Sequence, residues 1–213
     1  MVRFVTFEGG DGTGKTTQIR ALESYLSSHG NACLVTREPG GTELGAMLRR
    51  VLLAAGGAPI APSSELFLYL ADRAQHVSEV IRPALAAGKI VLCDRFTDST
   101  LAYQGYGRGL DLGLLRQFNS VADDGTRPDL TLLFDCPIVI GLGRTASRQA
   151  QSQVDVPQED RFEREMLEFH EKVRAGFLDL ARQEPGRFRV IDASRPAEDV
   201  SLEINKIIDE ALR

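Results

Sequence analysis

The residues best suited to chemistry begin with a glycine-rich stretch near the start of the chain. Residues 9–16 read GGDGTGKT and fit the spacing G-x-x-x-x-G-K-[ST], between an apolar run and a helical pattern. Glycines at this spacing let backbone N–H groups surround phosphate oxygens, while the lysine reaches the β- and γ-phosphates and the threonine hydroxyl ligates Mg²⁺. The expected contacts with a nucleotide are Gly9, Gly10, Asp11, Gly12, Thr13, Gly14, Lys15, Thr16 and Thr17.

A carboxylate and a guanidinium follow the apolar run Ile90–Cys93, which reads as a buried strand. In an open parallel sheet the carboxyl ends of the strands face the ligand crevice. We therefore expect Asp94 to hold Mg²⁺, directly or through water, and Arg95 to bind a phosphate. Such a pair at a strand end is more often structural, and the phosphate loop is what favours a functional interpretation here.

Two further stretches combine cations with neutral hydrogen-bonding groups. Residues 36–42 (TREPGGT) carry Arg37 and Glu38, and Arg49 lies in the helix expected after them. Residues 97–105 (TDSTLAYQG) add hydroxyls, an aromatic ring and an amide. Cations suit a phosphate and uncharged polar groups suit a base and a sugar, so an acceptor site beside the phosphate loop is predicted.

Tyr69 and Arg73 lie four residues apart in an expected helix and therefore share one of its faces. A ring beside a guanidinium could stack on a base and hydrogen-bond its edge. Spacing alone favours the plainer alternative of a core tyrosine beside a solvent-exposed arginine, and both interpretations stay open at this point.

Short apolar runs alternate with longer helical patterns, which predicts an α/β fold with a five-stranded parallel sheet and helices on both faces. The expected strands are Arg3–Phe7, Ala32–Thr36, Ile90–Cys93, Leu130–Phe134 and Arg189–Ile191. The expected helices are Lys15–Ser28, Glu43–Leu53, Ser64–Ala87, Leu112–Ala122, Glu163–Gln183 and Ala197–Leu212. The core-facing stripe of the third helix is expected at Leu66, Leu70, Ala74, Val77, Ile81 and Leu85.

Residues 147–160 (SRQAQSQVDVPQED) break this pattern, because they are polar, rich in glutamine and short of large apolar side chains. Such a segment buries little surface, so it predicts a mobile loop. It is either a plain surface loop or part of a lid that excludes water from a reactive phosphoryl group. We favour a lid over residues 141–161, within a single domain that spans residues 1–213.

The composition limits the classes of function. With 43% hydrophobic and 26% charged residues and a net charge of −5, the chain can form a full core but offers no broad basic surface for duplex nucleic acid. No apolar stretch approaches the roughly 20 residues that cross a bilayer, and nothing near the start resembles a signal peptide. Cys33, Cys93 and Cys136 lack C-x-x-C spacing. These features predict a cytoplasmic protein with reduced thiols and neither a nucleic-acid nor a membrane partner.

Taken together, these stretches resemble the bacterial thymidylate kinases, a family of P-loop nucleoside monophosphate kinases. The shared pattern runs through FEGGDGTGKTT, TREPGGT, LFLYLADRAQH, DRFTDSTLAYQGYGRG and DASRP, so it covers nearly the whole chain. This combination is far more specific than the phosphate loop, which many unrelated NTPases have. The resemblance implies transfer of the γ-phosphoryl group of ATP to thymidine 5′-monophosphate (dTMP), with Mg²⁺ as cofactor, by a homodimer.

The resemblance also assigns roles to single residues. Asp11 would accept a hydrogen bond from the 3′-hydroxyl of dTMP, and Tyr103 would pack where a ribose 2′-hydroxyl would otherwise lie. Tyr69 would stack on thymine, where the family usually has phenylalanine, and Arg73 would bond the thymine edge. The other implied contacts are Arg37, Arg49 and Arg95 at the acceptor phosphate, Glu38 and Asp94 near the metal, Ser99, Thr100 and Gln104 around the base, and Asp192 and Ala193 near adenine.

The chain departs from some family members within the phosphate loop. Those members carry an arginine after the acidic residue, where this chain has Gly12. The loop therefore resembles the class in which the lid supplies a catalytic cation, here Arg144 or Arg148, with Arg161 a weaker candidate. The expected catalytic residues are Asp11, Lys15, Arg95, Arg144 and Arg148.

Two other classes of protein fit parts of the pattern. A deoxynucleoside kinase needs a carboxylate to accept the proton of a 5′-hydroxyl, and Glu38 is available, but a neutral nucleoside gives the arginines no anion to bind. A nucleotide-dependent switch would want an N-K-x-D motif or a water-orienting glutamine, and the sequence offers neither clearly. Within the monophosphate kinases, use of dUMP stays open, because one methyl group is worth only about 1–3 kcal/mol.

Overall fold

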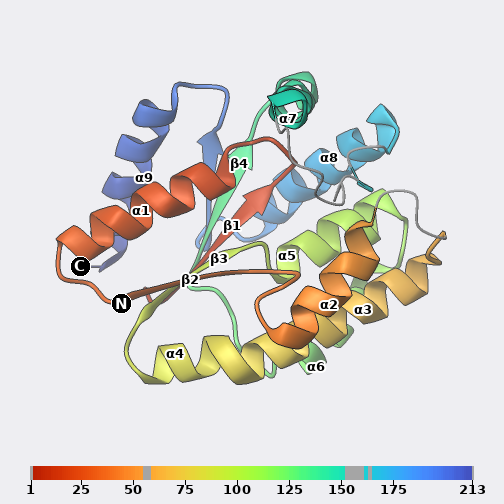
Figure 1. Ribbon diagram of the computed structural model, residues 1–213, viewed down its shortest axis with the longest axis horizontal. Coiled ribbons are helices and arrows are strands. Elements are labelled where there is room, and N and C mark those ends of the chain that lie inside the picture. The colour runs from red at the N-terminus through yellow and green to blue at the C-terminus, as the bar shows by residue number, and fades with distance from the viewer. Residues whose placement is uncertain (1, 55–58, 152–160, 163–164, 213) are drawn as a thin grey trace.

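The computed structural model describes residues 2–54, 59–151, 161–162 and 165–212, without the side chains of residues 148–151. Its strands form one parallel sheet in the order β2-β3-β1-β4-β5 (Figure 1). They are β1 (Phe4–Gly9), β2 (Cys33–Arg37), β3 (Ile90–Asp94), β4 (Leu130–Asp135) and β5 (Phe188–Asp192). The predicted α/β fold with five parallel strands is therefore confirmed.

Helices cover both faces of this sheet, also as predicted. On one face α1 and α9 lie side by side (Figure 1), and their apolar side chains pack on β1, β4 and β5. The other face is covered by α3, α4, α6 and α8, while α2 packs on α3. The bounds are α1 (Lys15–Ser28), α2 (Glu43–Leu53), α3 (Pro62–His76), α4 (Arg82–Ala86), α6 (Leu112–Ala122), α8 (Leu167–Gln183) and α9 (Ala197–Leu212).

The central strands are buried on both sides, which explains why they read as unbroken apolar runs. Successive residues of a strand point to opposite faces, and in β4 Leu132 joins the cluster under α1 and α9. Its neighbour Leu133 joins the cluster under α8. Both side chains are at most 1% exposed.

The helix expected over Ser64–Ala87 is one helical run with a wider turn inside it. After α3 comes a π-helical segment, η1 (Val77–Ile81), and then α4. Pro83 has no N–H to donate to the carbonyl of Glu79, and its ring would crowd that carbonyl in a regular helix. A widened turn just before a proline relieves this conflict.

The stripe predicted on α3 is wrong at one position. Leu66, Leu70 and Val77 are buried, but Ala74 is exposed and Arg73 takes its place in the core. Arg73 lies three residues after Leu70 and four before Val77, so it continues the same face. The residue type did not indicate that position 73 is buried, because arginines seldom lie in a core without partners.

Two helical segments were not predicted. One is α5 (Thr97–Thr100) with the π-helical η2 (Leu101–Gly107), whose Thr, Ser, Gly and Tyr residues are poor helix formers. The other is α7 (Ile138–Gln151), so the loop expected to begin at Ser147 is wrong for residues 147–151, and residues 152–160 lie outside the described part. Tertiary packing stabilises both segments, since η2 lies against α8 and α7 against the phosphate loop.

Of the helices within the described ranges, none is both long and apolar enough to cross a membrane.

Burial of both sheet faces can be tested on adjacent residues of β4. We expect Leu132→Ala and Leu133→Ala each to lower the free energy of unfolding by about 2–5 kcal/mol, because each leaves a cavity in a separate core. Urea unfolding followed by circular dichroism measures this. Leu202→Ala is the control, since Leu202 is 66% exposed on α9. A near-neutral effect at either β4 position would mean that its face is not covered as described.

Candidate functional site

The phosphate loop joins β1 to α1 at the carboxyl edge of the sheet. Gly14 precedes the helix with φ 89°, a left-handed conformation that suits glycine. The Lys15 ammonium donates to the carbonyl oxygens of Gly10 at 2.6 Å and Gly9 at 3.1 Å. Burial, with the charge on Arg95, lowers the pKa of Lys15 to about 8, against the opposing effect of nearby carboxylates.

The loop packs directly on the backbone of α7. A Cβ atom added at Gly12, whose φ is +70°, would lie 2.0 Å from the carbonyl oxygen of Gly141. A Cβ added at Gly141 would in turn lie 2.5 Å from the carbonyl oxygen of Asp11. This backbone contact leaves no room for a side chain at position 12, which gives a physical reason for the glycine there.

Thr16 and Asp94 lie together beneath the loop, with their side-chain oxygens 3.2 Å apart. The other carboxylate oxygen of Asp94 is buried and has no hydrogen-bond partner among the described residues. A hydroxyl beside a partly buried carboxylate with an oxygen to spare fits Mg²⁺, which usually takes one or two protein ligands and completes its shell with water and phosphates. Within the described ranges, no three acidic, histidine or cysteine side chains gather as a protein-only metal cage.

Arg95 joins the phosphate loop to the segment that follows β3. Its guanidinium donates to Asp11 at 2.7 Å and to the carbonyl oxygen of Gly9 at 2.9 Å, and it lies 5.1 Å from the centre of the Tyr103 ring. Burial alone would raise the pKa of Asp11, but the charges on Arg95 and Lys15 outweigh it and hold that pKa below its usual value. The predicted neighbourhood of Asp11, Lys15 and Arg95 is therefore present.

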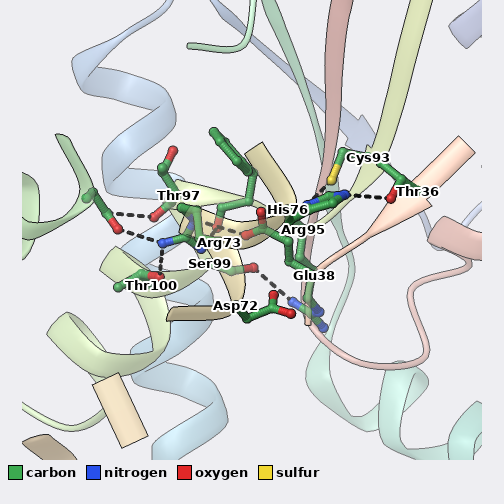
Figure 2. Close-up of polar contacts among 12 residues, drawn as sticks. Thr36, Glu38, Asp72, Arg73, His76, Cys93, Arg95, Thr97, Ser99 and Thr100 are labelled. Atoms are coloured by element: carbon green, nitrogen blue, oxygen red, sulfur yellow. Dashed lines mark hydrogen bonds and ion pairs between the residues drawn. The ribbon is translucent and has the colours of Figure 1, made fainter. Parts of the chain in front are cut away.

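Arg73 lies at the centre of a buried chain of polar contacts. Figure 2 shows Thr36, His76, Glu38 and Arg73 linked in that order. The Glu38 carboxylate accepts from Arg73 and from His76, both at 2.9 Å, so each of its oxygens has a partner. Arg73 is only 2% exposed, so the alternative of a solvent-exposed arginine is wrong. It donates further to Thr100, Asn119 and the carbonyl oxygen of Phe96.

The remaining residues expected around the acceptor lie along the same edge. Tyr69 is half-buried, and Arg49 donates to the carbonyl oxygen of Pro39 at 2.9 Å. Gln104 is buried and donates to Glu65 at 2.8 Å. The Tyr103 ring packs edge-on against Phe162 with centroids 5.5 Å apart. Arg37 is exposed at the end of β2, and Ser99 is partly buried beside Arg95.

The residues expected near ATP beyond the phosphate loop lie in α7 and in the loop after β5. Arg144 donates to the carbonyl oxygen of Ala193 at 2.8 Å, which places this lid candidate beside the stretch expected to contact adenine. Asp192 is exposed and accepts from the backbone N–H of Ser194. Arg161 instead donates to Glu65 and to the carbonyl oxygen of Leu52. The side chain of Arg148 lies outside the described part.

Several residues at this edge were not predicted. Glu8 is fully buried, and its carboxylate accepts from the N–H of Phe96 and the hydroxyl of Ser99. Burial, together with the Asp98 carboxylate, raises the pKa of Glu8 to about 8, against the lowering effect of its hydrogen bonds and of Arg95. The sequence could have indicated a role for Glu8, since it is a carboxylate within an apolar strand. The sequence around His76 and Asn119 gives no such signal.

A pocket opens beside the phosphate loop between the end of β4, α7 and α8. Asp11, Cys136 and His170 are among its lining residues. The Nε2 atom of His170 is buried without a hydrogen-bond partner among the described residues. At the rim, Arg174 and Asp135 form a two-bond ion pair at 2.6 and 2.8 Å.

The sheet order, the phosphate loop and the strand-end carboxylate define a P-loop kinase fold of the nucleoside monophosphate kinase type. The family model described as thymidylate kinase matches residues 7–204. Thymidylate kinase of Desulfovibrio desulfuricans is 56% identical over 99% of this chain and 96% of its own. Thymidylate kinase of Geobacter sulfurreducens is 52% identical over 96% of this chain and 95% of its own. The crystal structure of thymidylate kinase from Ehrlichia chaffeensis matches with TM-score 0.75 and 38% identity over 96% of this chain and 97% of that chain.

The chain belongs to the thymidylate kinase family. The activity predicted from the sequence, that of a phosphotransferase of this family, is confirmed.

The backbone contact between the phosphate loop and α7 generates a test. We expect Gly12→Ala to lower kcat/KM for ATP by roughly 10- to 100-fold, because the loop must move by about 1 Å to admit a Cβ atom. Steady-state kinetics at varied ATP concentration measure this. The control is Gly186→Ala, where an added Cβ meets no atom within 4 Å. Unchanged kinetics in Gly12→Ala would mean that α7 gives way and does not restrain the loop.

Proposed function

We propose that this protein transfers the γ-phosphoryl group of ATP to dTMP, giving ADP and dTDP for dTTP biosynthesis. The observation that carries this proposal is the position of Arg95, which joins the phosphate loop to the acceptor side through Asp11. A cation there can bind an acceptor phosphate close to the transferring group, and holding two reactants in place supplies much of the rate.

The donor ATP is assigned to the loop from Gly9 to Thr17, with Lys15 at its β- and γ-phosphates. Arg144 is assigned to ATP as well, and its contact with Ala193 beside Asp192 supports this. Arg144 or Arg148 supplies the catalytic cation of a lid formed by residues 141–161, within one domain over residues 1–213. The start of α7 supports the lid assignment, because it touches the phosphate loop.

The acceptor dTMP is assigned to the opposite side of Arg95. Arg37, Arg49 and Arg95 bind its phosphate, and Asp11 accepts from its 3′-hydroxyl. The Tyr69 ring stacks on thymine, and Tyr103 occupies the space of a 2′-hydroxyl. The hydroxyl of Tyr103 is buried without a partner among the described residues. The thymine edge and its surroundings are assigned to Arg73, Ser99, Thr100 and Gln104.

Thr16 and Asp94 would hold Mg²⁺, which neutralises phosphate charge when bound. Glu38 lies close to them in the sheet, since its backbone N–H donates to the carbonyl oxygen of Asp94 at 3.0 Å. Both of its carboxylate oxygens already accept from Arg73 and His76. This supports Glu38 mainly as the partner that holds Arg73 for dTMP, and a direct contact of Glu38 with the metal would have to replace one of these two hydrogen bonds.

The chemistry needs no general base. The acceptor oxygen belongs to a phosphate whose second pKa is about 6, so it is mostly dianionic at neutral pH. A kinase for the 5′-hydroxyl of thymidine would need a free carboxylate, and the pairing of Glu38 argues against it. The residues of this chain contribute cations that bring the phosphates of ATP and dTMP together, and a loop that holds ATP in place.

An acceptor panel tests this proposal. With ATP and Mg²⁺, we expect rapid ADP release with dTMP and none with thymidine. With dUMP the turnover should be at least about tenfold slower than with dTMP, because dUMP lacks one methyl group. Arg95→Ala should lower kcat/KM for dTMP by about 10- to 100-fold, since a charged hydrogen bond is worth about 1.5–3 kcal/mol. Exposed Arg20→Ala is the control. Turnover of thymidine with dTMP inert would refute the acceptor assignments.

We further propose that the protein is a homodimer working in the cytoplasm. Apolar side chains are exposed on the adjacent helices α2, α3 and α6, among them Val51 at 55%, Phe67 at 55% and Val121 at 80%. Exposed apolar groups gathered on one face favour association with another protein surface. The free thiols of Cys33, Cys93 and Cys136 support a reducing compartment.

Phe67→Glu tests the dimer. A charge in the middle of an apolar interface should convert the protein to a monomer, because desolvating an unpaired carboxylate is unfavourable. Sedimentation velocity measures the change, and Leu202→Glu on α9 is the matched control at another exposed apolar residue. A wild-type protein that sediments as a monomer would refute the dimer.

A further inference from the structure

Glu8 lies in β1, the central strand of the sheet, and its side chain is 0% exposed. One carboxylate oxygen accepts from the backbone N–H of Phe96 at 2.8 Å, and the other accepts from the hydroxyl of Ser99 at 2.5 Å. A carboxylate is expensive to bury, so one kept in a central strand needs such partners. Both partners belong to the short segment that follows β3.

Arg95 begins that segment in a conformation that needs support. Its φ is +68°, and Asp124 is the one other non-glycine residue with a positive φ in the described part of the chain. Backbone strain of this kind persists only where the surroundings hold it. The N–H of Arg95 donates to the carbonyl oxygen of Phe7 at 3.0 Å, and the next N–H, that of Phe96, donates to Glu8. Consecutive residues of β1 thus fix the peptide groups on both sides of Arg95.

A second path leads from Glu8 to the guanidinium itself. The Ser99 hydroxyl donates to Glu8 and accepts from Nη1 of Arg95 at 3.3 Å. The same nitrogen donates to the Gly9 carbonyl oxygen, and Nη2 donates to Asp11. Glu8 therefore supports both the backbone and the side chain of Arg95.

Other buried groups hold the segment at different points. Arg73 binds the carbonyl oxygen of Phe96, and Arg187 binds Asp98 with two bonds at 2.7 and 2.9 Å. Among the described residues, Glu8 is the one side chain bonded both to the peptide N–H after Arg95 and to Ser99.

We propose that Glu8 is a positioning residue for phosphoryl transfer, which aims the Arg95 guanidinium at the acceptor phosphate without touching substrate. The inference rests on the proposed role of Arg95 and deepens it. It assigns a function in the reaction to a carboxylate that lies beneath the phosphate loop and outside both nucleotide sites.

Two substitutions separate the hydrogen bonds from the bulk of the side chain. Glu8→Met removes both acceptors at similar volume, and we expect kcat/KM for dTMP to fall at least about tenfold, because the buried N–H of Phe96 loses its acceptor and Arg95 loses its support. KM for ATP should change less than about twofold, because Lys15 and the loop are not touched. Glu8→Gln keeps an acceptor for Phe96 and should restore most of the activity. Wild-type kinetics in Glu8→Met would overturn the proposal.

A double-mutant cycle tests whether Glu8 acts through Arg95. In an Arg95→Ala background, Glu8→Met should change kcat/KM for dTMP by less than about threefold, since coupled residues are not additive. An equal loss in both backgrounds would show an independent effect and overturn the proposal. If Glu8→Met shows no cooperative unfolding in urea, the same cycle with Glu8→Asp decides by the same criterion, because the shorter side chain withdraws the carboxylate from Phe96 and Ser99.

Val5→Ala is the matched control for general loss of stability. Val5 is 0% exposed on the same strand and packs in the cluster under α1 and α9, whose buried residues include none from the segment that follows β3. We expect it to lower the urea midpoint while leaving KM for dTMP unchanged; a rise in KM equal to that of Glu8→Met would overturn the proposal.

Crystal structures of the wild type and Glu8→Met separate this inference from the proposed function. Without wild-type turnover of dTMP the proposed function fails, and the structures then decide the role of Glu8. Loss of the Arg95–Asp11 contact in the variant supports it, and an unmoved Arg95 overturns it.

Discussion

The ion pair between Arg95 and Asp11 joins two loops that are 84 residues apart in the chain. It forms because β1 and β3 are parallel neighbours, with Phe7 opposite Asp94, so the loops that follow them leave the sheet at the same edge. Lys15, Thr16 and Asp94 are brought to that edge by the same pairing. The contact between Arg95 and Asp11 therefore links the phosphate loop to the segment after β3.

Buried polar networks hold that segment from below. Glu8 binds it from β1, Arg73 binds it from α3, and Arg187 binds Asp98 from the loop before β5. Each network takes charges out of water, which is unfavourable unless the partners are complete. Their value to the protein lies in fixing geometry, because a buried donor or acceptor with a single satisfied arrangement resists displacement.

Close backbone packing restrains the phosphate loop from the side of α7. Gly12 and Gly141 allow the phosphate loop and α7 to touch without side chains between them. Arg144, one turn further along α7, then reaches the carbonyl oxygen of Ala193. The helix that borders the phosphate loop thus also borders the loop expected to contact adenine. A movement of α7 would therefore shift the contacts of both loops.

The sequence by itself determined the strands, the phosphate loop and the family, because apolar runs, glycine spacing and adjacent motifs are properties of short segments. The structure places Asp11, Lys15 and Arg95 together as predicted, and Thr16 beside Asp94. Only the tertiary structure decided that Arg73 is buried, that Glu38 is held by His76, and that Glu8 supports Arg95. It also decided that residues 138–151 form a helix. The physical reason is that burial and hydrogen-bond partners come from residues far apart in the chain, and the type of a residue does not reveal which partner will neutralise it.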